Sequence, residues 1–141
     1  MRILLIDDDK DDQALFCEAV ARIEPKLQIE VAENGEQGIV NLASKVDLPV
    51  LVFLDINMPV LNGWDTLDLI RSNPGMSGSR VVIYSTSSQQ ADKARAERFG
   101  ASFISKSNSF ENMVQSLSTV IRQAIQEYQV VKVKELIREP K

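Results

Sequence analysis

The chain has 141 residues, a length that suits one domain, because one hydrophobic core usually serves about 100 to 200 residues. Hydrophobic residues make up 44% and charged residues 26%, as in an ordinary soluble globular protein, and the formal net charge of −4 argues against binding to nucleic acid. Cys17 is the one cysteine, which excludes an internal disulfide, and the absence of histidine leaves carboxylates, hydroxyls and lysines for any chemistry.

The sequence contains no sign of a membrane segment. No apolar run approaches the roughly 18 residues of a membrane span, and Asp7 comes too early for a signal peptide. A single thiol also fits a reducing compartment. We therefore expect a cytoplasmic protein that binds no membrane.

Short apolar runs alternate with helical patterns five times along the chain, which predicts five β/α units and a parallel sheet. Residues 3–6, 50–54 and 81–84 are nearly unbroken apolar runs, as expected of central strands covered by helices on both faces. Residues 27–31 alternate between apolar and polar, and residues 102–105 are short and half polar, so both predict edge strands. The predicted fold class is α/β, a doubly wound five-stranded parallel sheet with helices on both faces.

Apolar residues at one-turn spacing predict the helices between these strands, because this spacing places them on one helix face. The first helix follows from Leu15, Phe16, Ala19, Val20 and Ile23, and the others are predicted over residues 36–44, 64–72, 89–99 and 109–127. The segment after Tyr128 supports either a continued helix or a short strand, and Pro140 ends it in both cases. In the helical alternative, Val130, Val133 and Ile137 share one face.

Polar side chains follow four of the five predicted strands, at the point where each strand ends. They are Asp7, Asp8 and Asp9 after the first strand, Asp55 and Asn57 after the third, Ser85 and Thr86 after the fourth, and Lys106 after the fifth. Ligands of doubly wound sheets bind beyond these strand ends, so we expect one site there. Crowded carboxylates repel one another by about 1 to 4 kcal/mol for each close pair and need a cation. Hard oxygen ligands select Mg²⁺, which often shares phosphate oxygens, so the pattern predicts a site for magnesium and a phosphoryl group.

The acidic run also has a simpler interpretation, since aspartate is a favoured helix N-cap and acidic residues suit a first helical turn. A cap uses one side chain, however, and Asp11 and Asp12 already supply charge to that turn. Asp7 and Asp8 then have no role in capping, which favours the metal site.

The strand-end residues resemble those of a known family. The acidic pair after the first strand, the segment Leu54-Asp55-Ile56-Asn57-Met58-Pro59 followed by Gly63, the hydroxyl of Ser85 and Lys106 stand in the order found in the receiver domain of bacterial two-component response regulators. The resemblance implies the flavodoxin-like strand order 2-1-3-4-5. We expect a receiver domain over residues 1–127 and a short extension over residues 128–141, without an output domain.

By this resemblance, Asp55 is the phosphoacceptor, and Lys106 and Ser85 contact the phosphoryl oxygens. The implied metal ligands are Asp8 and Asp55 directly, Asp7 through a bound water, and the backbone carbonyl of Asn57. An ionised carboxylate is already a nucleophile, so forming an acyl phosphate needs no histidine on this chain. The donor would be a phosphohistidine on a sensor histidine kinase or a phosphotransfer protein. The chain would then dephosphorylate itself and turn over no external substrate.

The resemblance also implies a conformational switch. In receivers the hydroxyl that matches Ser85 moves toward the phosphoryl group, and the aromatic residue three positions before the lysine, here Phe103, turns inward. The alternative is that Phe103 simply fills the core. One charge-assisted hydrogen bond worth about 1.5 to 3 kcal/mol shifts a two-state ratio about tenfold to a hundredfold, which suffices for signalling. The face of the fourth helix, fifth strand and fifth helix would then bind a protein target.

Two positions depart from the family pattern. Ser85 stands where threonine is common, so it keeps the hydroxyl but lacks a methyl group that restricts the rotamer. Lys106 is followed by Ser107, where the family usually has a proline, often after a cis bond. A cis bond before any other residue costs about 2.5 to 4 kcal/mol, so the sequence leaves either a strained loop or a trans path.

The extension suggests a partner. Its apolar residues are Val130, Val131, Val133, Leu136 and Ile137. One exposed apolar patch of this size is costly, so we expect these residues to pack on the domain or on a second copy. Homodimerisation through the last helix and the extension is one hypothesis.

Other classes share parts of the pattern. A flavodoxin-like electron carrier needs hydroxyls and glycine after the first strand, where the carboxylates of this chain would repel a flavin phosphate. A phosphatase of the haloacid dehalogenase type normally has a second acidic residue two positions after the nucleophile, where Asn57 stands. An unphosphorylated receiver-like scaffold or dimerisation module is the remaining alternative, and it is disfavoured because no acidic position is missing.

Overall fold

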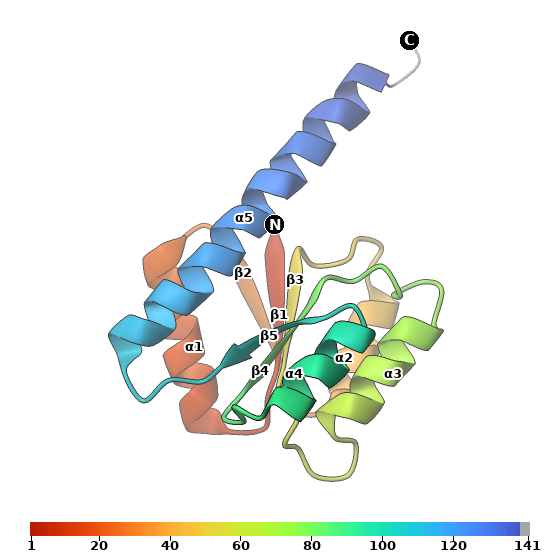
Figure 1. The fold of residues 1–141 in the computed structure, drawn as a ribbon. Helices are drawn as coiled ribbons and strands as arrows, with labels where there is room; N and C mark the ends of the chain where they lie inside the picture. The colour runs from red at the N-terminus through yellow and green to blue at the C-terminus, as the bar shows by residue number, and fades with distance from the viewer. Residues whose placement is uncertain (139–141) are drawn as a thin grey trace.

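The five apolar runs of the sequence form one parallel sheet in the structure, a computed structural model that describes residues 1–138 (Figure 1). The strands are β1 (Arg2–Ile6), β2 (Gln28–Ala32), β3 (Leu51–Leu54), β4 (Val81–Ser85) and β5 (Ser102–Ser105). Their order is β2-β1-β3-β4-β5, and every neighbouring pair is parallel. The predicted fold class and strand order are therefore confirmed, with β2 and β5 at the edges.

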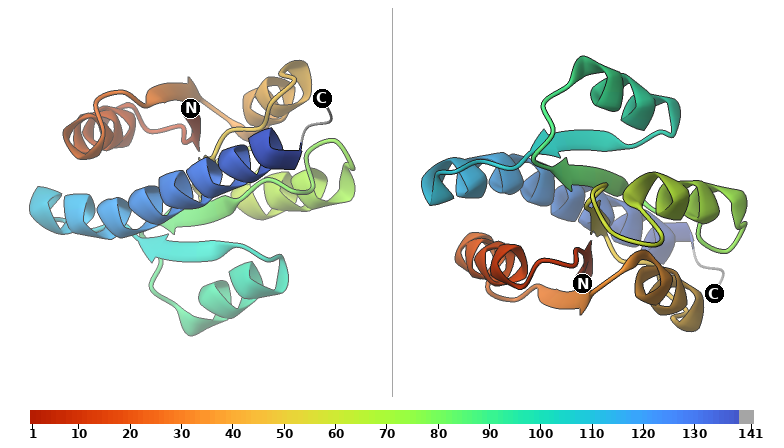
Figure 2. Two further views of the ribbon diagram at one scale, coloured as in Figure 1. Left: turned by 90° about the horizontal axis from the view of Figure 1, so that it is seen from above. Right: turned by 90° about the horizontal axis from the view of Figure 1, so that it is seen from below.

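Five helices cover the two faces of the sheet. They are α1 (Lys10–Ile23), α2 (Gly35–Ser44), α3 (Gly63–Ser72), α4 (Gln90–Arg98) and α5 (Phe110–Arg138). Helices α1 and α5 cover one face, and α2, α3 and α4 cover the other (Figure 2). None of these helices, within residues 1–138, combines the length and the apolar content that a bilayer crossing needs.

Apolar side chains fill the space on both sides of the sheet, which explains the unbroken apolar runs of the central strands. Successive residues of β1 contribute alternately to two buried clusters, one under each helical layer. Under α1 and α5, the ring centre of Phe16 lies 4.9 Å from that of Phe53 and 5.9 Å from that of Tyr84, both in edge-to-face arrangements. Such aromatic pairs contribute about 0.5 to 1.5 kcal/mol each beyond their burial.

Three helices start with a side-chain cap directly after a strand-end loop. The side chains of Asp9, Asn34 and Asn62 each accept a hydrogen bond, of 2.8 to 2.9 Å, from the backbone N–H three residues later. Each such cap stabilises its helix by about 1 kcal/mol. Asp9 is therefore the capping residue of the acidic run, and Asp7 and Asp8 are free for another role.

Helix α5 is much longer than the sequence pattern predicts. It continues without a break through Tyr128 to Arg138, so the expected end near residue 127 is wrong, and the helical alternative for the extension is correct. Residues 128–138 contain neither glycine nor proline, and nothing in their sequence stops the helix. Pro140, the predicted stop, lies outside the described residues.

The last turns of α5 extend past the sheet into solvent (Figure 1). Val130 is 47% exposed, Val133 is 55% exposed and Ile137 is 78% exposed. The expectation that these residues pack on their own domain is therefore wrong. The straight helix carries them beyond the edge of the core, while Leu117 and Ile121 of the same helix are fully buried.

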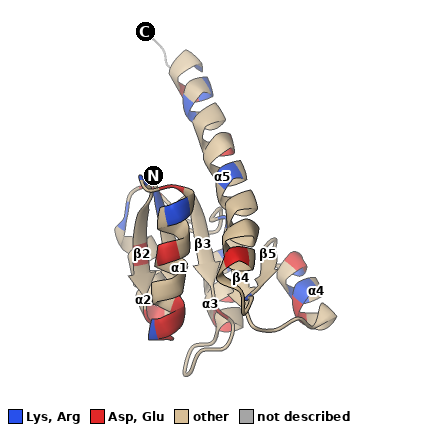
Figure 3. Ribbon diagram, turned by 90° about the vertical axis from the view of Figure 1, so that its left-hand side faces the viewer, with Lys and Arg blue, Asp and Glu red and all other residues tan. Residues whose placement is uncertain are grey.

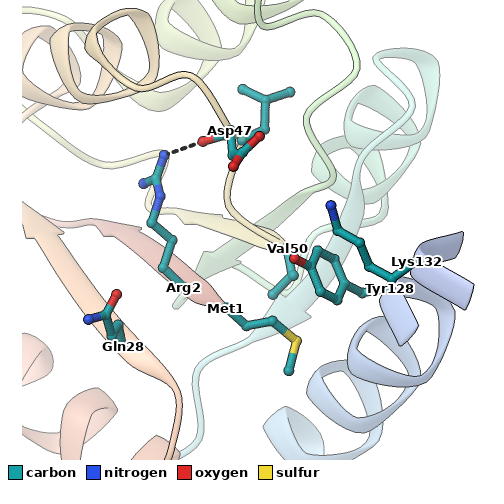
Figure 4. Close-up of a pocket in the computed structure, with 8 residues that line it drawn as sticks. Met1, Arg2, Gln28, Asp47, Val50, Tyr128 and Lys132 are labelled. Atoms are coloured by element: carbon teal, nitrogen blue, oxygen red, sulfur yellow. Dashed lines mark hydrogen bonds between the residues drawn. The ribbon is translucent and has the colours of Figure 1, made fainter. Parts of the chain in front are cut away.

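A pocket lies where α5 leaves the sheet (Figure 4). Tyr128 and Lys132 of α5 line it together with Arg2 and Asp47. Arg2 is fixed there by a 2.8 Å hydrogen bond to the carbonyl oxygen of Asp47, and the Lys132 ammonium lies 5.4 Å from the centre of the Tyr128 ring. The pocket is at the start of β1 and hence at the opposite end of the strand from Asp7.

Candidate functional site

Three carboxylates meet at the carboxyl ends of β1 and β3. Oxygen atoms of Asp7, Asp8 and Asp55 all lie within 4.8 Å of one another. Asp7 is 1% exposed and Asp55 is 6% exposed, whereas Asp8 is open to solvent. Acidic residues gather at this end of the molecule, opposite the N-terminus (Figure 3). The parallel sheet thus places carboxylates from two separate segments in one cluster, of which Asp7 and Asp55 are buried.

Burial raises the pKa of Asp7 and of Asp55, because a carboxylate loses hydration when it leaves water. Lys106 opposes this rise in both groups, mainly through a hydrogen bond to Asp7 and through its charge at Asp55. The charges of Asp7 and Asp8 raise the pKa of Asp55 further. The cluster therefore holds more negative charge than the one lysine balances, which is the condition under which a further cation binds.

Lys106 lies among the carboxylates. Its Nζ donates to Asp7 Oδ2 at 2.9 Å and to Asp12 Oδ2 at 2.8 Å, and it lies 3.7 Å from Asp55 Oδ2. Burial lowers the pKa of Lys106, but the Asp12 and Asp7 carboxylates outweigh burial, so its pKa is raised overall. The ammonium is therefore charged, and its side chain is only 9% exposed.

The loop after Lys106 takes the trans path. None of the peptide bonds that the structure describes is cis, so the bond before Ser107 needs no strained isomer. The backbone N–H of Lys106 donates to the carbonyl oxygen of Ser85 at 2.7 Å, which aligns the ends of β4 and β5. The lysine reaches the carboxylates without the proline that commonly follows it in the family.

Ser85 and Asn57 form the neutral side of the site. The Ser85 hydroxyl is fully buried and accepts a 3.3 Å hydrogen bond from Asn57 Nδ2. The backbone N–H of Asn57 donates to Asp55 Oδ1 at 3.1 Å. The sequence predicted a role for the backbone of Asn57, whereas the contact between its side chain and Ser85 is an additional finding. Asn57 thereby links the hydroxyl at the end of β4 to the carboxylate at the end of β3.

Phe103 lies in the middle of the edge strand β5. It is partly buried and packs against the apolar cluster under α2, α3 and α4. Its backbone is paired with Ile83 of β4, two residues before Ser85. The ring therefore contributes to the core in this structure.

Gly63 allows the first turn of α3 to rest on the loop that carries Asp55. A Cβ atom at position 63 would lie 2.4 Å from both the carbonyl oxygen of Asp55 and the Cα of Ile56. The Gly63 N–H also donates to the Ile56 carbonyl at 3.2 Å. This close approach of two backbones fixes the loop behind the carboxylate.

Two contacts of the site lay beyond the sequence analysis. The first is the pairing of Asp12 with Lys106, because the sequence suggested only a helix-end role for Asp12. The second is Tyr84, whose ring centre lies 5.4 Å from Lys106 Nζ. The Tyr84 hydroxyl is buried and has no hydrogen-bond partner among the described residues, and burial raises its pKa to about 12. The sequence places Asp12 in the first turn of the first helix, but no sequence signal places Lys106 beside it.

Comparison with known proteins places this geometry in a family. Residues 3–118 match the family model described as the response regulator receiver domain. The nitrate/nitrite response regulator protein NarL of Escherichia coli is 39% identical over 99 residues, which are 70% of this chain and 44% of NarL. The chain therefore spans less than half the length of that relative.

Two further comparisons cover nearly whole proteins. Protein PilH of Pseudomonas aeruginosa is 29% identical over 85% of this chain and 97% of PilH. The crystal structure of the phosphorylated cyanobacterial phytochrome response regulator RcpA has a TM-score of 0.76 and 26% identity, over 84% of this chain and 89% of RcpA. The resemblance noted at the strand ends is thus confirmed, and the chain belongs to the receiver domain family of the response regulators of two-component signalling.

Proposed function

We propose that the chain accepts a phosphoryl group on Asp55 in a Mg²⁺-dependent reaction, from a histidine kinase or a phosphotransfer protein. The observation that carries this proposal is the meeting of three carboxylates and one lysine at the ends of β1, β3 and β5. RcpA, which is 26% identical to this chain over the aligned residues, was solved as a phosphorylated response regulator. We assign the exchange to the cytoplasm, which the single thiol of Cys17 fits.

The carboxylate cluster fits a magnesium ion. Its oxygen atoms lie within 4.8 Å of one another, and Mg²⁺ takes hard oxygen ligands of this kind, one or two carboxylates directly and others through bound water. Asp8 and Asp55 are the proposed direct ligands, Asp7 the ligand through water, and the Asn57 carbonyl a fourth protein group. Bound there, Mg²⁺ would offset the carboxylate charge and hold phosphoryl oxygens.

Asp55 is the proposed nucleophile. One of its carboxylate oxygens forms a bond to phosphorus while the bond from phosphorus to the donor nitrogen breaks, and the electron pair leaves with the imidazole of the donor. No general base is needed, since the attacking carboxylate is ionised. Lys106, 3.7 Å from Asp55 Oδ2, is near enough to neutralise the transferred oxygens. Water would later attack phosphorus and restore Asp55, so the chain would turn over no external substrate.

The phosphoryl group would change the face formed by α4, β5 and α5. It brings roughly two negative charges and three acceptor oxygens, which attract the Ser85 hydroxyl away from Asn57. The end of β4 is coupled to β5, because Ser85 is paired with Ser105 in the sheet and the Ser105 hydroxyl donates to the Ser87 carbonyl at 3.0 Å. A shift at Ser85 would therefore reach Phe103 along β5 and alter the surface that a target protein binds.

Intact-protein mass measurement tests the acceptor. Incubation with Mg²⁺ and acetyl phosphate is expected to add one phosphate to the parent and none to Asp55→Asn, because the variant lacks the attacking oxygen anion. Asp68→Asn, at an exposed position of α3, is the matched control and should be labelled like the parent. Equal labelling of the parent and Asp55→Asn would refute the assignment.

The exposed turns of α5 favour a second role, self-association. Val130, Val133 and Ile137 form one apolar stripe of the helix outside the domain core, and Gln126 and Gln129 flank it. We infer that a second copy covers this stripe, because a twofold arrangement pairs the same patch with itself. Lys134 stands beside it and offers a charge at the rim of such an interface.

Sedimentation velocity tests the association. The full chain is expected to sediment as a dimer at about 100 µM, and Val133→Lys to shift it to monomer, because a buried unpaired ammonium costs several kcal/mol. Val40→Lys is the control, since Val40 is 65% exposed on α2, which covers the opposite face of the sheet from α5. A parent that remains monomeric at this concentration would rule out the dimer.

A further inference from the structure

We propose that Asp12 is a positioning residue that competes with the phosphoryl group for Lys106, and that it restrains the lysine in the unphosphorylated protein. This inference rests on the proposed phosphorylation of Asp55. Asp12 lies in the first turn of α1, outside the three-carboxylate cluster. It thus regulates the site without being one of its proposed ligands.

The hydrogen bonds of Lys106 carry the argument. An ammonium has three N–H donors, and two of them are used by Asp7 at 2.9 Å and Asp12 at 2.8 Å. The distance to Asp55 is 3.7 Å, beyond hydrogen-bond range. In the structure, the lysine is therefore held by its neighbours and is not bonded to the phosphoacceptor.

Both ends of the Asp12–Lys106 pair are fixed by the backbone. The N–H of Asp12 donates to the Asp9 side chain at 2.9 Å, and the N–H of Lys106 donates to the Ser85 carbonyl at 2.7 Å. The Tyr84 ring lies 5.4 Å from the ammonium and forms an apolar wall on that side. The ammonium is thus within reach of both Asp12 and Asp55.

Phosphorylation of Asp55 would change which of the two carboxyl groups, Asp12 or Asp55, holds the Lys106 ammonium. Asp55 carries one negative charge, whereas a phosphoryl group there carries roughly two and offers three more acceptors. Lys106 would then move toward Asp55 and away from Asp12. A ligand shifts a two-state equilibrium only by its differential interaction with the two states, so the charge of Asp12 directly opposes the phosphorylated state.

Phosphorylation of the full chain by acetyl phosphate and Mg²⁺ tests this competition. Asp12→Asn is expected to lower the donor concentration that gives half-maximal labelling of Asp55 by about three- to tenfold, an effect limited by the partial exposure of Asp12. Asp11→Asn is the matched control, because Asp11 is exposed in the same helical turn and makes no contact with Lys106. Asp12→Glu retains the charge and should behave like the parent.

A second measurement uses unfolding by urea without Mg²⁺ and does not depend on phosphorylation. Asp12→Asn should lower the urea midpoint in the parent. In a Lys106→Met background it should leave the midpoint unchanged or raise it, since the Asp12–Lys106 pair is absent there and only the repulsion between Asp12 and Asp7 is removed. An equal midpoint shift in both backgrounds would overturn the pairing.

The outcomes separate the two proposals. If the parent is labelled on Asp55 and Asp12→Asn responds like Asp11→Asn, the competition is wrong and the proposed function stands. If the parent takes no phosphate on Asp55, the proposed function fails and the competition fails with it.

Discussion

Replacing Gly63 with alanine is expected to lower the free energy of unfolding by about 2 to 4 kcal/mol, because the added methyl group has no space. Its Cβ would lie 2.4 Å from the Asp55 carbonyl oxygen and from the Ile56 Cα, which are backbone atoms that no rotamer change can move. Either α3 or the loop behind Asp55 must shift. We therefore also expect slower labelling of Asp55.

Urea unfolding monitored by circular dichroism measures this effect. Gly78→Ala is the matched control, since a Cβ at Gly78 meets nothing within 4 Å and the residue does not have a positive φ. Its effect should stay below about 1 kcal/mol. Similar losses in the two variants would show that alanine acts through general backbone effects and not through the contact with the Asp55 loop.

Replacing Arg71 with methionine is expected to cost about 2 to 3 kcal/mol, because one guanidinium ties three segments together. It donates to the carbonyl oxygens of Phe99 at 2.6 Å, Ser79 at 2.7 Å, Ser77 at 3.0 Å and Gly100 at 3.2 Å. Methionine keeps much of the length of the side chain and removes every donor. The carbonyls of Ser79 and Phe99 are partly shielded from water, so they lose most when the donors are removed.

The same urea experiment tests Arg71, with Arg98→Met as its control. Arg98 is exposed at the end of α4, and its side chain makes no hydrogen bond or ion pair within residues 1–138, so the change there should be about 0.5 kcal/mol or less. If Arg71→Met unfolds at the same urea concentration as Arg98→Met, the carbonyl contacts do not stabilise the fold.

The sheet was predictable because its physical causes are local. Unbroken apolar runs arise where both faces of a strand are covered, and the two half-polar runs correspond to β2 and β5 at the edges. The parallel arrangement then brings every strand end to one side. For this reason the cluster of Asp7, Asp8 and Asp55 could be expected from sequence positions that are far apart.

The pairing of charges within the site was not predictable in the same way. Lys106 is 94 residues from Asp12 along the chain, and their contact depends on how the loop after β5 turns toward α1. Apolar periodicity places a helix on a sheet but says nothing about that turn. The lack of a partner for the Tyr84 hydroxyl could not be predicted from the sequence for a similar reason, because the residues around it come from α1 and the loop after β5.

The end of α5 was missed because no change in composition marks it. The core that its first part covers ends near Ala124, yet residues 125–138 contain no glycine or proline that would end the helix. Apolar residues in this stretch suggested packing on the domain. The structure shows instead that α5 continues beyond the surface on which its first part lies, because the hydrogen bonds of a helix join residues along the chain and need no packing partner.

Helix α5 also has a mechanical property that follows from its length. Its 29 residues begin four positions after Lys106 and, at about 1.5 Å each, span roughly 43 Å. A rod of this length acts as a lever, so a tilt of about 5° at its first turn displaces the far end by roughly 4 Å. A shift of less than one ångström beside Lys106 can in this way become a movement of several ångströms at the far end of α5, at the opposite end of the molecule from the carboxylates.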